Sequence, residues 1–318
     1  MSNVAPADFA AAVETIKTHA RVALHFHPDR IGPTGETVAA GLRRIGTYQS
    51  QFTTGLSNGK LSPEPDGPRA RWESGLFGEA YRDAPPAARP KYGALHLMRF
   101  PDGPCPRFGS CYFLLRPDVT TRCTLSYGDS YRDPRERGTL DAPDDVLAAL
   151  LTDAFERDAV LGMPGVRPAA LVGHLGRLEQ PFEVSGAPGR NLDHYVEAQV
   201  HGPVRLWEDV ETLVADPSFR NTEVEEELVV LCRNHEIDLR YHAGYRMDAA
   251  DVPTDFRGPT MPALARRVAH EGRIDAHQIG VAAARVMGNP ERWGDPTVAL
   301  QELKLLWHVL VRHGRPQA

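Results

Sequence analysis

The chain has 318 residues, of which 42% are hydrophobic and 25% charged, as in a globular protein with one large domain or two ordinary ones. Its formal net charge of −6 does not favour nonspecific binding to nucleic acid or to an anionic membrane. No segment approaches the ~18 consecutive apolar residues that a transmembrane helix needs, so we expect no membrane partner.

The cysteines and the N-terminal segment bear on the cellular compartment. The four cysteines form no CxxC pair, and their spacing suits neither a zinc ribbon nor a disulfide scaffold. The first 20 residues lack the basic start and apolar core of a signal peptide. We therefore expect reduced thiols and a cytoplasmic protein, a pattern that remains compatible with export as an effector.

Helices and strands are both predicted in the first 206 residues. Apolar residues at helical spacing predict a helix over 7–20, and a short strand then ends in LHFHPDR, residues 24–30. A second helix is expected over 35–45, followed by a Pro-rich loop over 61–70. The remaining predictions are strands within 89–100, 109–117 and 120–130, a helix over 143–160, and extended chain over 181–206.

Beyond about residue 207 the pattern is mostly helical. We expect a mixed α+β core in residues 1–215 and a helical C-terminal region in residues 216–318. The predicted C-terminal helices cover 208–215, 222–235, 261–271, 276–287 and 297–313.

Ionisable side chains are concentrated in LHFHPDR. Residues i and i+2 of a strand point the same way, so His25 and His27 are positioned to bind one metal ion, as in a metal-dependent hydrolase. Together with Arg30, the same histidines are also suited to bind an anionic nucleotide. In a third interpretation one histidine packs in the core and the other is exposed.

Two later segments carry polar side chains on strands. Arg89 precedes a strand, where a guanidinium can hold a phosphate or carboxylate bidentately. Thr124 and Ser126 share one face of the next hydroxyl-bearing strand, an arrangement that is also ordinary for half-buried strands. In DHYVEAQVHGPVRL, residues 193–206, Glu197 lies between Tyr195 and Gln199 on one strand face, so its carboxylate can stabilise a developing cation or remain simply solvated.

The order of these segments resembles the ADP-ribosyltransferase superfamily, particularly its bacterial toxin-like members. The resemblance covers roughly residues 20–215 and rests on RPKYGAL, YFLLRPDVTTRCTLSYGDS and YVEAQVHGPV; the HFHPDR opening is similar to that of an uncharacterised bacterial family. It implies a split β-sheet core and NAD as a substrate. In that family an early Arg or His anchors NAD, a middle strand carries Ser or Thr, and a late strand carries the catalytic Glu.

Carried over residue by residue, the resemblance makes Glu197 the acid that stabilises an oxocarbenium-like state as nicotinamide leaves. Ser126 and Gln199 complete the expected catalytic set. The candidates for NAD binding are His25, His27, Arg30, Arg89, Tyr92 and Thr124.

The late strand departs from the family pattern, since Glu197-Ala198-Gln199 has no second acid at i+2. Arginine modification is therefore doubtful, and the acceptor is expected to be another protein group, a small molecule or water. Under this interpretation no metal is expected. Two alternatives stand beside it: a metal-dependent hydrolase that uses His25 and His27, and a catalytically inactive nucleotide-binding protein.

Overall fold

An eight-stranded sheet forms the centre of the protein, in a computed structural model that describes residues 4–56, 64, 66–286 and 288–317. The fold is thus mixed α+β, as the sequence predicts. Neighbouring strands are antiparallel except β11 and β12, which are parallel. In sheet order the strands are β12 (Asp238–Tyr241), β11 (Val210–Ala215), β4 (Cys111–Leu115), β1 (Val22–Phe26), β3 (Lys91–Leu95), β9 (Val196–Val200), β5 (Cys123–Tyr127) and β6 (Arg137–Gly138).

The central strands are buried on both faces, in keeping with the mostly apolar sequences of β1 and β4, whereas β9 buries the polar side chains of Glu197 and Gln199. Every residue of β1, β4 and β9 is buried. β1 and β3 approach closely at Gly93, where a Cβ atom would lie 2.5 Å from the carbonyl oxygen of Ala23. A side chain at position 93 would therefore force the two strands apart.

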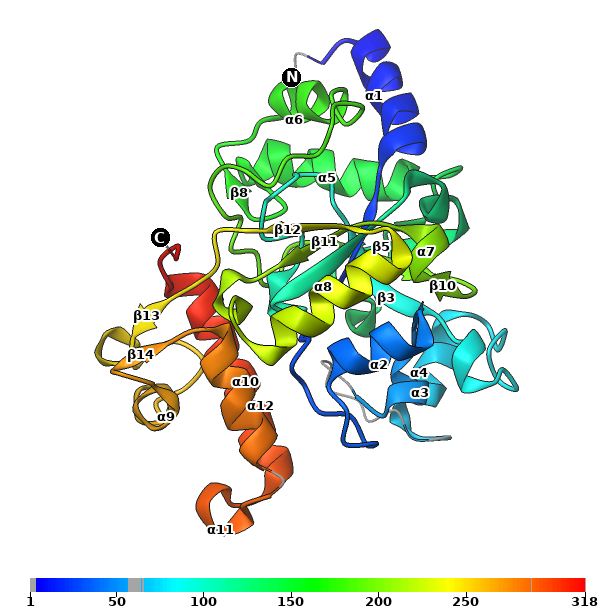
Figure 1. Ribbon diagram of the computed structural model, residues 1–318. Coiled ribbons are helices and arrows are strands. Elements are labelled where there is room, and N and C mark those ends of the chain that lie inside the picture. The colour runs from blue at the N-terminus through cyan, green and yellow to red at the C-terminus, as the bar shows by residue number, and fades with distance from the viewer. Residues whose placement is uncertain (1–3, 57–63, 65, 287, 318) are drawn as a thin grey trace.

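Helices cover the sheet in separate groups (Figure 1). α1 (Pro6–His19), α5 (Asp144–Glu156) and α6 (Pro168–Leu175) pack together, and α2 (Val38–Ile45) packs against α8 (Glu223–His235) elsewhere on the sheet. α10 (Ala276–Val286) and α12 (Pro296–His313) pack against each other, and α9 (Met261–Val268) joins α12. The remaining α-helices are α3 (Gln51–Thr54), α4 (Pro68–Leu76), α7 (Leu206–Asp209) and α11 (Pro290–Trp293). Three short strand pairs lie outside the main sheet: β2 (Thr47–Tyr48) with β10 (Val204–Arg205), β7 (Ala159–Val160) with β8 (Met163–Pro164), and β13 (Met247–Asp248) with β14 (Arg273–Ile274).

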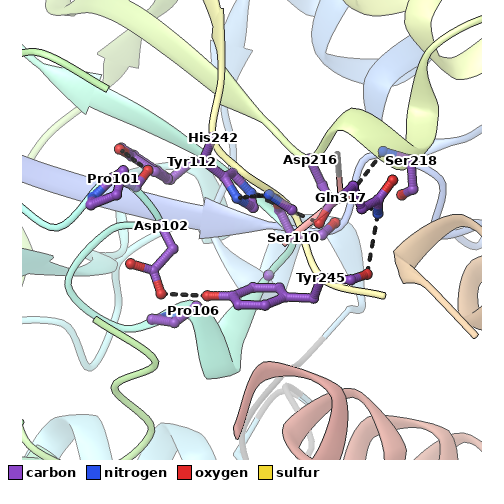
Figure 2. Close-up of polar contacts among 12 residues, drawn as sticks. Pro101, Asp102, Pro106, Ser110, Tyr112, Asp216, Ser218, His242, Tyr245 and Gln317 are labelled. Carbon is purple, nitrogen blue, oxygen red and sulfur yellow. Dashed lines mark hydrogen bonds and ion pairs between the residues drawn. The ribbon is translucent and has the colours of Figure 1, made fainter. Parts of the chain in front are cut away.

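A buried polar cluster ties the C-terminal region to the sheet (Figure 2). The Tyr245 hydroxyl donates to the Asp102 carboxylate, and His242 Nε2 lies 3.1 Å from the Ser110 carbonyl oxygen. Trp307 of α12 donates from its indole nitrogen to the Pro106 carbonyl oxygen, at 2.8 Å. Because buried polar groups without partners are costly, the Trp307 bond fixes α12, and the other two bonds fix the segment 242–245, against the loop that precedes β4.

Most of the predicted elements are confirmed, but several are shorter than predicted: the helix expected over 143–160 ends at Glu156, and the helix expected over 261–271 ends at Val268. The helix predicted over 208–215 is wrong: Val210–Ala215 forms β11, and only Leu206–Asp209 is helical. The short apolar pattern of this segment suits a helix as well as a strand, and pairing with β4 on one side and β12 on the other makes it a strand. The extended segment 181–206 forms strands only at β9 and β10. Residues 216–318 are mostly helical but also contribute β12 to the sheet.

Part of the predicted Pro-rich loop is helical, since α4 begins at Pro68, and the loop's residues 61–63 and 65 lie outside the described residues. No helix within the described ranges combines the length and apolar character needed to cross a membrane.

Candidate functional site

A cavity of about 660 Å³ opens beside the ends of β1, β3 and β9. This volume is within the range of about 300–1,000 Å³ that is usual for small-molecule sites. Its walls come from segments far apart in the sequence, including the loop after β1, helix α4, the 3₁₀ turn Pro106–Phe108 and helix α12. The lining side chains that matter below are His25, His27, Arg30, Arg69, Trp72, Tyr92, Arg107, Phe108, Glu197, Arg257, Lys304 and His308.

Glu197 lines this cavity from β9, and its side chain is held by its neighbours. Strand register places it opposite Ser126 of β5 and Ala94 of β3. Its Oε1 accepts from the Ser130 hydroxyl and from Gln199 Nε2, the latter at 2.8 Å. Burial raises the pKa of Glu197 to about 7, although the hydrogen bonds from Ser130 and Gln199 oppose the increase. At neutral pH the side chain therefore exists in both protonation states.

A directional chain of hydrogen bonds orients Gln199. The Thr124 hydroxyl donates to Gln199 Oε1 at 2.7 Å, so the His201 Nε2 atom, 3.0 Å from that hydroxyl, must be a donor. His201 Nδ1 then accepts from the Tyr81 hydroxyl at 2.5 Å. Burial lowers the pKa of His201, which is consistent with this neutral tautomer. The chain turns the Gln199 amide nitrogen toward Glu197 and Ser126, the latter at 3.2 Å.

The three residues predicted from the sequence as catalytic, Glu197, Ser126 and Gln199, therefore lie next to one another. Glu197 alone of the three lines the cavity, whereas Ser126 and Gln199 lie behind it, fully buried. Thr124, predicted to bind the cofactor, does not line the cavity but acts on Gln199. Hydroxyl and amide groups on β5 and β9 thus position the carboxylate rather than contact a ligand directly.

The two histidines of HFHPDR both line the cavity but contact different groups. His25 lies within β1, with Nδ1 3.2 Å from the Gly109 carbonyl oxygen and its ring against Tyr112. His27 follows the strand, 3.3 Å from the Ser110 hydroxyl and edge-on to Trp307. Burial lowers the pKa of each histidine to about 3, so both are neutral. Among the described residues, no group of three or more His, Cys, Asp or Glu side chains is placed to hold a metal ion.

Of the three other residues predicted to bind NAD, two line the cavity and one does not. Arg30 and Tyr92 line the cavity. Arg89 does not; its Nη1 donates to Glu73 at 2.9 Å, and its guanidinium lies over the Phe52 ring. The interior position of Arg89 reflects the buried carboxylate of Glu73, which needs a cationic partner.

A family model described as "Protein of unknown function (DUF3626)" matches residues 21–313. The chain belongs to the DUF3626 family. The match begins just before β1 and ends with α12, so it includes every wall of the cavity. No curated protein matches the sequence.

Sequence reasoning missed several cavity residues of this DUF3626 protein. Arg69 is only 5% exposed, and its guanidinium lies over the rings of Trp72 and Tyr92, 5.3 and 4.9 Å from their centroids. The signal was present in PRARWE, where Pro68 is suited to the first turn of a helix and Arg69 precedes Glu73 by four residues. The residues contributed by α12 carry no comparable local signal.

Proposed function

We propose that this protein cleaves the nicotinamide–ribose bond of NAD and transfers the ADP-ribosyl group to an acceptor or to water. The observation that carries the proposal is a buried carboxylate, Glu197, that faces a cavity of about 660 Å³ and is held by two donors. Arg69, Trp72 and Tyr92 supply a cationic and aromatic wall beside it, which suits a phosphorylated ligand with planar rings.

In the proposed reaction, the carboxylate stabilises a positive charge that develops on the ribose as nicotinamide leaves. The C1′–N1 bond breaks, its electron pair leaves with nicotinamide, and the positive charge of the pyridinium passes to the ribosyl C1′–O4′ unit. Ionised Glu197 stabilises that charge in a site of low dielectric constant, where a fixed charge acts strongly. The acceptor oxygen or nitrogen then bonds to C1′ and loses its proton to solvent.

Additional support comes from the resemblance to ADP-ribosyltransferases. The resemblance assigns Glu197 the same role, and Ser126 and Gln199 lie where a hydroxyl and an amide can steady it. Position 199 carries an amide rather than a second acid, so the proposed acceptor is one that needs no additional base, such as water or an already ionised group.

Release of nicotinamide tests the proposal. The protein is incubated with NAD, with and without a cell lysate as the acceptor source, and nicotinamide is separated and quantified. We expect release by the wild type and its loss in Glu197→Gln. Binding of NAD without release in any condition would instead indicate an inactive nucleotide-binding protein and would contradict the proposal. Activity that EDTA abolishes would indicate the metal-dependent alternative.

A further inference from the structure

A second wall of the cavity is cationic and comes largely from the C-terminal region. Arg107 belongs to the 3₁₀ turn before β4, Arg257 precedes α9, and Lys304 and His308 lie one turn apart on α12. All four line the cavity that Glu197 also lines. We call these four residues the α12 wall.

The two arginines of the α12 wall share one carboxylate partner. A single carboxylate, Asp193, pairs with both guanidiniums, at 2.6 Å from Arg107 Nη1 and 3.3 Å from Arg257 Nη2. Within the described residues, the Nε atoms of both arginines are buried without a hydrogen-bond partner. Two guanidiniums that share one carboxylate keep a net positive charge, and their buried Nε–H groups remain available as donors.

His308 provides a second, independent sign that a ligand belongs here. Its side chain is only 2% exposed, and neither ring nitrogen has a hydrogen-bond partner of normal geometry among the described residues. Burial, with the nearby charges of Arg257 and Arg107, lowers its pKa to about 2, so the ring is neutral and offers one N–H donor. Buried polar atoms without partners cost free energy, and a bound polar group would satisfy them.

We propose that the α12 wall binds the diphosphate of a ligand whose other end reaches Glu197. Two guanidiniums and an ammonium group match the paired oxygens and multiple charges of a diphosphate better than a single carboxylate would. The Phe108 ring, 4.9 Å below the Arg107 guanidinium, holds that group in place before the ligand arrives. The identity of the ligand's other end rests on the proposed function, but the diphosphate site does not.

Binding of inorganic pyrophosphate tests the site directly. Isothermal titration calorimetry on the full chain at moderate ionic strength is expected to show binding by the wild type. Arg257→Gln and Lys304→Gln are each expected to weaken it about tenfold, the effect of losing one charge-assisted hydrogen bond. Arg285→Gln, an exposed position of α10 outside the cavity, serves as the matched control, and thermal unfolding verifies that each variant is folded.

The outcomes separate this site from the proposed function. Absence of pyrophosphate binding by the wild type, equal binding by Arg257→Gln and Lys304→Gln, or equal weakening by Arg285→Gln overturns the diphosphate site. Weakened binding in the two wall variants, together with no nicotinamide release from NAD, supports the site and contradicts the proposed function. Nicotinamide release with an unchanged KM for NAD in Arg257→Gln contradicts the site alone.

Discussion

The two walls of the cavity differ in how their polar groups are satisfied. The first, which we call the β5–β9 wall, consists of Glu197 with Thr124, Ser126 and Gln199 behind it: Glu197 accepts from Ser130 and Gln199, and Gln199 is itself fixed by Thr124. On the α12 wall, buried nitrogens of Arg107, Arg257 and His308 have no hydrogen-bond partner of normal geometry among the described residues. The first wall is therefore preorganised to hold one carboxylate in place, whereas the second has buried donors that a bound ligand could satisfy.

Replacement of the Glu197 carboxylate should show most clearly that the two walls have different roles. Glu197→Gln is expected to lower nicotinamide release from NAD by roughly a hundredfold or more, since it removes charge stabilisation in the transition state. Pyrophosphate binding is expected to remain at the wild-type level, because Glu197 lies on the other wall. Steady-state kinetics and calorimetry measure the two quantities. Similar turnover in wild type and variant would remove Glu197 from the chemistry.

The pH dependence of turnover is expected to follow Glu197. Its pKa is raised to about 7, and the reaction requires the ionised form, so kcat/KM for NAD should fall about tenfold per pH unit below that value. Arg257→Gln should leave this pKa unchanged, because it belongs to the α12 wall. The measurement is kcat/KM from pH 5 to pH 9. A profile that is flat between pH 5 and pH 7 contradicts the assignment.

The hydrogen-bond chain behind Glu197 should affect kcat more than KM. Thr124→Val removes the hydroxyl that fixes Gln199, and the released amide can turn its oxygen toward the carboxylate; we expect kcat to fall about tenfold. Thr124→Ser keeps the hydroxyl and serves as the control. If Thr124→Val and Thr124→Ser have equal kcat values, the chain does not position Glu197.

The last expected effect is on stability rather than on turnover. The folded-state pKa of Glu197 is raised from the ordinary value of 4.5, so the folded protein binds this proton more tightly than the unfolded chain. Its contribution to the free energy of unfolding is present below pH 4.5 and is lost as pH rises through about 7. Glu197→Gln should therefore be more stable than wild type by roughly 1–3 kcal/mol at pH 8, a difference that disappears near pH 4. Urea unfolding at both pH values measures it.

The sequence predicted the β5–β9 wall better than the α12 wall, for a physical reason. The alternation of a strand is local, so the spacing of Glu197 and Gln199 places both on one face, and β5 and β9 then pair Ser126 opposite Glu197. His308 reaches the cavity only through packing of α12 against a turn about 200 residues earlier. No local pattern encodes such a contact.

Tertiary context also explains the two clearest differences from the sequence-based expectations. Val210–Ala215 forms a strand because β4 and β12 flank it, although its short apolar pattern also suits a helix. Arg89 was expected at the ligand, but buried Glu73 holds its guanidinium away from the cavity. Arg69, four residues before Glu73, lines the cavity instead.

The most direct test is a crystal structure of Glu197→Gln, whose turnover should be slow enough to trap intact NAD. The account predicts the ribose of the nicotinamide half against residue 197 and the diphosphate against Arg107, Arg257 and His308. NAD bound outside the cavity, or with its diphosphate directed away from α12, would contradict the claim that both walls hold one ligand.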